Sequence, residues 1–290
     1  GNVTLTNTQI ISGVFNGDNG ADNRYTTLTW ADLNGDGYMD LFVAGLGGQG
    51  GTTGANSAVY YNDGAGNLVS TANGVGLANS TNVATNGVNK QVFSDNVNSM
   101  TSLAVDWNGD GKMDLVEFAG VAGSTATNNA LNIGLVWLNG GVNSATGQVN
   151  WTSETILTNS NLSGTYFTTG ALAVDLDYDG DQDLVVFRAQ GGKTEYIENT
   201  NKVVDGTSII LRLLDKNGVN AFYGNTVMLI DEATGQVVSS QVINPQGGVN
   251  MKNSKGLVYF YGLDAYNSYS AVMLASGSDV GGVTSVTLNG

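Results

Sequence analysis

Three short acidic segments, each between two runs of hydrophobic residues, constrain the fold of this chain more than any other feature. They begin at Asp32, Asp106 and Asp175 and have the sequences DLNGDGYMD, DWNGDGKMD and DLDYDGDQD. Each follows a strand-like run, as at residues 101–105, and precedes another, as at residues 115–120. Three copies of strand, acidic loop and strand predict an all-β protein built from repeats.

Each repeat continues with two further predicted strands. The third strands are predicted at residues 58–61, 133–138 and 194–197, and the fourth at residues 67–70, 150–157 and 208–214. Four antiparallel strands per repeat are typical of a propeller blade. The turn at residues 62–67 contains Asp-Gly, which favours a hairpin. Long surface loops are predicted where Asn, Gly, Ser and Thr are frequent and patterning is weak, at residues 71–99, 121–130 and 139–148.

The spacing of oxygen-bearing residues in each acidic segment predicts a calcium site. Ca²⁺ takes six to eight oxygen ligands. Positions 1, 3, 5 and 9 carry carboxylate or amide side chains, position 7 offers a main-chain carbonyl, and Gly at position 6 permits a sharp bend. The sequence therefore predicts about three ions. The predicted ligands are Asp32, Asn34, Asp36, Tyr38 and Asp40; Asp106, Asn108, Asp110, Lys112 and Asp114; and Asp175, Asp177, Asp179, Asp181 and Asp183.

An EF-hand is the main alternative for such loops, and the sequence excludes it. An EF-hand needs a bidentate Glu at position 12 and a helix on each side. Position 12 holds Val43, Glu117 and Val186 in the three segments, and all three lie between predicted strands.

The repeats, with Phe118-Ala119-Gly120 after the second acidic segment, resemble FG-GAP/VCBS repeats over about residues 10–205. The resemblance implies β-propeller blades like those of integrin α subunits and secreted bacterial surface proteins, with structural Ca²⁺ bound by the acidic loops on one face. Propellers close with about four to eight blades, so three repeats predict part of a larger propeller. We expect either a longer polypeptide or edges paired with neighbouring copies, and residues 3–15 resemble the outer strand of a preceding blade.

A small antiparallel β domain is predicted to follow the repeats, which divides the chain at residues 1–205 and 206–290. Its strands are predicted at residues 225–230, 236–243, 256–261 and 270–274, with turns at 215–218 and 233–235; residues 208–214 fit either part. This region more faintly resembles ASPIC/UnbV-like domains, at residues 211–218, 259–263 and 275–277.

Composition limits the classes of function that this chain can have. The net charge of −15 excludes a basic surface for nucleic acid, and no apolar run is long enough to insert into a membrane. The chain has no Cys, and the absence of His removes the commonest general base. We therefore expect no catalytic residues, and a secreted or cell-surface role in adhesion or assembly, with a protein or glycan ligand or neighbouring copies as partners. Lack of Cys and scarcity of Pro favour a large bacterial surface protein.

Two alternatives stay open at the level of sequence. A polysaccharide lyase or hydrolase would need paired carboxylates, for which the candidates are Glu117, Glu154, Glu195 and Glu198. A carbohydrate-binding propeller would need an exposed aromatic residue, and Trp107 at position 2 of its acidic loop is the candidate.

Overall fold

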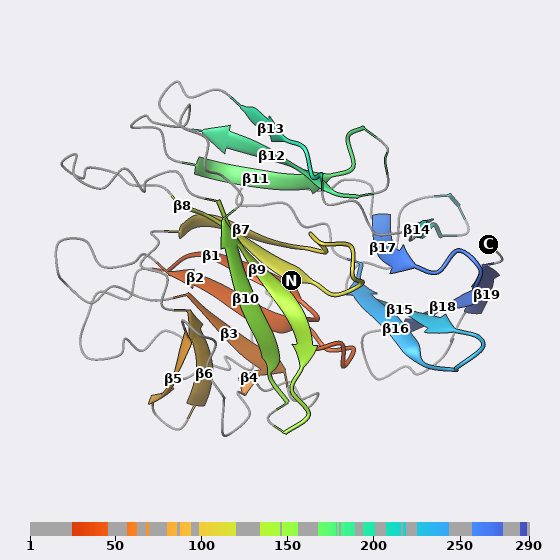
Figure 1. Ribbon diagram of the computed structural model, residues 1–290, viewed down its shortest axis with the longest axis horizontal. Helices are drawn as coiled ribbons and strands as arrows, with labels where there is room; N and C mark the ends of the chain where they lie inside the picture. The colour runs from red at the N-terminus through yellow and green to blue at the C-terminus, as the bar shows by residue number, and fades with distance from the viewer. Residues whose placement is uncertain are drawn as a thin grey trace, which may run out of the picture.

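The computed structural model is built from antiparallel β-sheets (Figure 1). Within the described part of the chain, no helix has the length and apolar character that crossing a membrane requires. The structure describes residues 25–45, 57–62, 68–69, 80–85, 88–93, 99–119, 134–145, 147–155, 168–177, 179, 181–188, 194–200, 207–215, 217–218, 225–243, 257–274 and 285–288.

The first sheet has the strand order β1-β2-β3-β6-β5, with β4 also paired to β3. Its strands are β1 (Tyr25–Ala31), β2 (Asp40–Gly45), β3 (Ser57–Asn62), β4 (Leu68–Val69), β5 (Ser80–Thr85) and β6 (Val88–Phe93). The predicted strands on both sides of the first acidic loop are confirmed. The prediction of a loop over residues 71–99 is wrong at β5 and β6, because main-chain pairing of β6 with β3 and of β5 with β6 makes strands of segments that lack an apolar pattern.

The second sheet has the order β10-β9-β8-β7. Its strands are β7 (Ser99–Val105), β8 (Asp114–Ala119), β9 (Gly134–Val142) and β10 (Val149–Thr155). The prediction of a loop at residues 139–148 is wrong for 139–142, where β9 continues through Gly140 and Gly141. The hairpin turn is shorter than predicted and is closed by hydrogen bonds between Asn143 and Gln148 and between Gly147 and Asn143.

The third sheet has the order β11-β12-β13, formed by β11 (Thr168–Val174), β12 (Asp183–Arg188) and β13 (Glu195–Ile197). The segment at residues 208–214 does not join it, because β14 (Thr207–Arg212) pairs with β17 (Leu257–Leu263). The predictions for residues 3–15, 63–67 and 121–130 fall outside the described residues.

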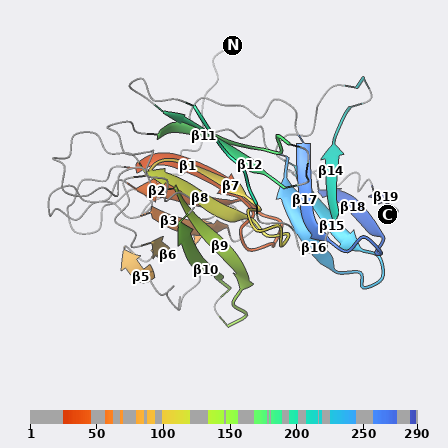
Figure 2. The ribbon, with the colours of Figure 1, turned by 45° about the horizontal axis from the view of Figure 1, so that its top comes forward.

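The three sheets lie side by side (Figures 1 and 2), and β7 contacts both β1 and β11. One apolar cluster, including Phe42 and Trp137, fills the space between the first and second sheets. A second, including Phe118 and Leu184, fills the space between the second and third. Burial of these large side chains stabilises the stack. Within the described residues the three sheets do not close into a ring.

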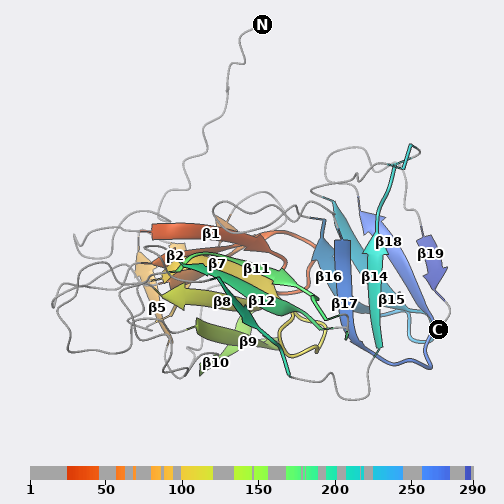
Figure 3. The ribbon, with the colours of Figure 1, turned by 90° about the horizontal axis from the view of Figure 1, so that it is seen from above.

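The C-terminal part forms two packed sheets, β14-β17 and β16-β15-β18-β19. The remaining strands are β15 (Thr226–Asp231), β16 (Val237–Val242), β18 (Tyr269–Leu274) and β19 (Ser285–Leu288). Their shared core includes Leu229, Ile243 and Phe260. The predicted strands and both predicted turns are confirmed, whereas β19 was not predicted. Figure 3 shows these sheets at one end of the three-sheet stack.

Candidate metal centre

The main chain of the first two acidic loops folds around the aspartate at position 1. Asp32 Oδ1 accepts hydrogen bonds from the amides of Gly35 at 2.8 Å and Asp36 at 3.1 Å, and its Oδ2 accepts one from Gly37 at 2.9 Å. Gly37 has φ +88°, a conformation that favours glycine, so the predicted bend at position 6 is confirmed.

The second loop repeats this arrangement. Asp106 accepts hydrogen bonds from the amides of Asp110 at 3.0 Å and Gly111 at 2.8 Å, and Gly111 has φ +86°. The same sequence pattern therefore gives the same local fold in two sheets.

The aspartate at position 9 clamps its loop to the rest of its sheet. Asp40 Oδ2 accepts from the Leu33 amide at 2.9 Å, and Oδ1 accepts from the Asn62 amide at 2.9 Å. Asp114 makes the matching pair with the amides of Trp107 and Asn139, and Asp183 with those of Leu176 and Asn199. Position 9 thus ties the start of the loop to the third strand of its sheet or to a residue just after that strand.

An asparagine in the last part of the third strand, or just after it, is a functional residue that sequence reasoning missed. The Asn139 side chain donates to the carbonyls of Met113 at 3.0 Å and Leu33 at 2.8 Å. Because Leu33 belongs to the first loop, Asn139 ties two sheets together. Asn199 does the same with Gln182 and Trp107. The signal was present in the sequence, since Asn139 directly follows the predicted third strand at residues 133–138, and Asn62 and Asn199 lie within two residues of the predicted strand ends at 61 and 197.

The side chains at positions 3, 5 and 7 lie at the exposed end of the first two loops. Asn34 Nδ2 donates to Asp36 Oδ2 at 2.8 Å, and Tyr38 is exposed. In the second loop, Asn108 Oδ1 accepts from the Asp110 amide at 3.1 Å, and Lys112 Nζ forms a 2.8 Å ion pair with Asp110.

The third loop gathers its carboxylates most closely. Ligand oxygens of Asp175, Asp177 and Asp179 lie within 4.8 Å of one another, and among the described residues no other group of three acidic side chains does so. The Asp181 side chain is buried against the same loop, and its Oδ1 has no hydrogen-bond partner within the described residues. Hard oxygens brought together in this way suit Ca²⁺.

Burial raises the pKa of several aspartates in these loops. Desolvation raises the pKa of Asp40 to about 8, and it raises the pKa of Asp106 and of Asp114 to about 7. The pKa of Asp181 rises to about 7 because of burial and then the charges of Asp179, Asp183, Asp177 and Asp175. Without a cation, ionised carboxylates are therefore costly at these positions, and a bound divalent ion would offset that cost.

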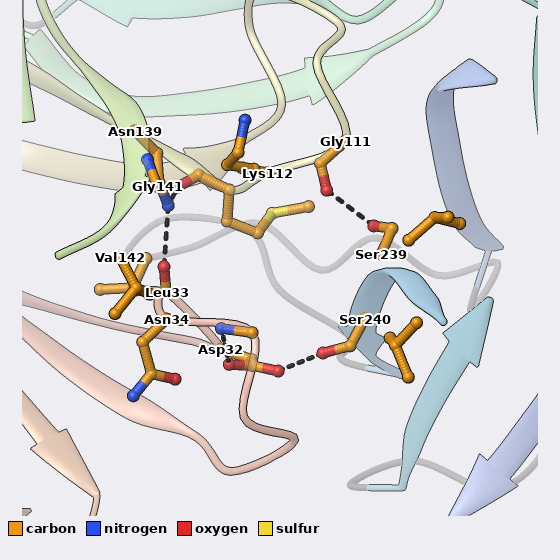
Figure 4. Close-up of a pocket in the computed structure, with 14 residues that line it drawn as sticks. Asp32, Leu33, Asn34, Gly111, Lys112, Asn139, Gly141, Val142, Ser239 and Ser240 are labelled. Atoms are coloured by element: carbon orange, nitrogen blue, oxygen red, sulfur yellow. Dashed lines mark hydrogen bonds between the residues drawn. The ribbon is translucent and has the colours of Figure 1, made fainter. Parts of the chain in front are cut away.

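The C-terminal sheets lie against the first two loops. Ser240 Oγ donates a hydrogen bond to Asp32 Oδ2, and Ser239 Oγ donates to the Gly111 carbonyl at 2.7 Å (Figure 4). Thr226 Oγ1 donates to the Gly37 carbonyl at 3.1 Å. The residues of the two serine contacts line a small hollow between the two loops and β16, together with Asn139 and Val142.

The glutamates considered for catalysis lie in different surroundings where the structure describes their side chains. Glu117 is fully buried between the first two sheets, where it accepts hydrogen bonds from Ser57 and Ser99 and from Trp137 Nε1 at 2.8 Å. Glu195 is paired with Arg188 at 2.8 Å. Glu198 is exposed, and the side chain of Glu154 lies outside what the structure describes.

The expectation that Trp107 is exposed for a ligand is wrong. Trp107 is only 6% exposed and packs in the cluster between the second and third sheets. Leu33 at the same position of the first loop is buried in the cluster between the first and second sheets. Position 2 is therefore a packing position wherever a following sheet covers it.

Comparison with known protein families agrees with this architecture. Residues 32–117, which contain the first two acidic loops, match the FG-GAP-like repeat family. No curated protein matches the chain. The chain is thus an all-β protein in which residues 32–117 match an FG-GAP-like repeat, a module that implies propeller blades and often binds calcium.

Proposed function

We propose that this chain is a calcium-stabilised propeller segment of a secreted or cell-surface protein, with a role in adhesion or surface assembly and no catalytic activity. The observation that carries the calcium assignment is the acidic cluster of Asp175, Asp177 and Asp179. The family match at residues 32–117 and the repeated loop geometry support calcium binding by the first and second loops as well.

The exposed face of the third sheet supports a longer propeller. Position 2 is buried at Leu33 and Trp107, where a following sheet covers it, but Leu176 is 51% exposed. The carbonyls of Leu33 and Trp107 each accept a hydrogen bond from an asparagine of the following sheet. A fourth blade would cover Leu176 and bring an equivalent asparagine to it.

The calcium assignment is tested by titration calorimetry on the chelator-treated chain. We expect about three ions, as the three loops predict. Asp179→Ala should remove one ion, because it takes a carboxylate from the third loop, whereas Glu232→Ala on the exposed β15–β16 turn should remove none. Equal ion counts in wild type and Asp179→Ala would contradict a site in the third loop.

The surface role is tested separately by measuring binding to glycan arrays and to extracellular matrix proteins in calcium and in chelator. Calcium-dependent binding without turnover of the bound polysaccharide supports adhesion. Cleavage of a polysaccharide would overturn the assignment in favour of an enzyme.

A further inference from the structure

The C-terminal sheets approach the acidic loops closely enough to take part in their chemistry. β17 bends at Gly262, which has φ +66°. A Cβ atom at Gly262 would lie 2.1 Å from the Gly109 carbonyl oxygen and 3.4 Å from the Asp110 Cα. Only glycine permits this approach, so the contact of β17 with the second loop is built into the sequence.

Tyr261, the residue before this bend, presents a buried hydroxyl that lacks a partner. Its side chain is 1% exposed, and within the described residues its hydroxyl forms no hydrogen bond. An unsatisfied buried polar group is costly. Burial raises the pKa of Tyr261, and the charges of Tyr259, Asp175, Asp106 and Asp181 raise it further. The Tyr261 hydroxyl is thus within electrostatic reach of carboxylates of the second and third loops, and the adjacent Gly262 packs directly on the second loop.

Asp181 supplies a second buried oxygen without a partner, in the third loop itself. Only its main-chain carbonyl was expected to act as a ligand. Its side chain is 6% exposed, and its Oδ1 forms no hydrogen bond within the described residues. Asp181 and Tyr261 thus offer two oxygens from different parts of the chain to one acidic region.

A cation accounts for both unpaired oxygens at once. Ca²⁺ takes six to eight oxygen ligands, and the third loop alone was expected to supply five. We propose that the Tyr261 hydroxyl and the Asp181 carboxylate complete the coordination of the third-loop cation, directly or through a water, so that the C-terminal sheets form part of this metal site. The inference rests on the proposed calcium binding of the third loop.

The test is calcium titration of the chelator-treated full chain by calorimetry, comparing wild type with Tyr261→Phe. Tyr259→Phe is the matched control, because Tyr259 lies on the same strand and stacks on Tyr261 with ring centroids 5.9 Å apart. We expect Tyr261→Phe to weaken one site about tenfold or more, the usual cost of losing an outer ligand, and Tyr259→Phe to match wild type. In an Asp179→Ala background, Tyr261→Phe should have no further effect on calcium affinity.

Asp181→Asn tests the same site without altering the C-terminal core, and it should weaken the same single site. Wild-type affinity in both Tyr261→Phe and Asp181→Asn, with the third site still filled, would overturn the inference and leave the proposed function standing. Failure of the wild-type chain to bind calcium would overturn both.

Discussion

The hydroxyl of Ser240 donates a hydrogen bond to the carboxylate of Asp32, although the two residues are 208 positions apart in the chain. Asp32 is the first residue of the first acidic loop, and Ser240 lies on β16 of the C-terminal part. Both side chains are buried. The first two acidic loops therefore form part of the surface on which the C-terminal sheets dock.

This contact predicts the effect of Ser240→Ala. Removing the donor leaves a buried carboxylate oxygen with one partner fewer, so the free energy of unfolding should fall by about 1–2 kcal/mol in urea denaturation. Ser270→Ala is the control, because Ser270 makes the same kind of bond to Glu232 at an exposed position, and it should cost less than about 0.5 kcal/mol. Equal losses would mean that the Ser240 contact does not hold the two parts together.

The bridging asparagine predicts a larger effect. Asn139→Ala leaves the carbonyls of Leu33 and Met113 without this donor, which should lower the free energy of unfolding by about 2–4 kcal/mol. Asn150→Ala, at an exposed position of the neighbouring strand, should change it little. A stability change below about 0.5 kcal/mol in Asn139→Ala would show that the bridge is dispensable.

The sequence predicted the parts of this molecule whose signal is local. The strands were predicted from the alternation of apolar and polar side chains. The loop bends were predicted from the spacing of Asp and Gly, because glycine adopts the required backbone conformation. The structure contains both. The asparagine bridges and the Ser240 contact were missed because each joins residues far apart in the chain. β5 and β6 were missed because they form through main-chain pairing, β6 with β3 and β5 with β6, and their sequences have no apolar alternation.

The burial of Trp107 could not be predicted for a different reason. At the sequence level its place in an acidic loop suggested exposure. Its burial depends on the third sheet, whose Leu184 and Val186 share its cluster, and a single loop carries no information about that neighbour.

The exposed leucine at position 2 of the third loop gives a test of the proposed fourth blade. Leu176→Ala should change the free energy of unfolding of this chain by less than about 0.5 kcal/mol, because the side chain is half exposed. Leu33→Ala, at the equivalent buried position, should cost about 2–4 kcal/mol. Similar losses in the two variants would show that Leu176 is already covered, and would contradict the proposed fourth blade.

Glu117 predicts a pH dependence of stability. Burial raises the pKa of this carboxyl above its usual value of 4.5, despite hydrogen bonds from Ser99, Ser57 and Trp137. The folded state therefore binds the proton more tightly than the unfolded state. The stabilisation of the folded state that results from this tighter proton binding is fully present below pH 4.5. It is lost as the pH rises through the folded-state pKa of Glu117.

Glu117→Gln should lack this dependence. In excess calcium, the stability of wild type relative to Glu117→Gln should fall as the pH increases above 4.5, measured by urea denaturation at a series of pH values. Parallel curves for the two proteins would show that Glu117 does not titrate differently on folding.

Thermal unfolding of the chain in calcium chloride and in EGTA tests the central claim most directly. Binding to the folded state alone stabilises it by mass action, by about 2.7 kcal/mol per site when free calcium is 100-fold above the dissociation constant. We predict that Tm rises steadily with calcium concentration and falls in EGTA. The same Tm in both solutions would contradict the account, because the acidic loops would then be turns that hold no ion.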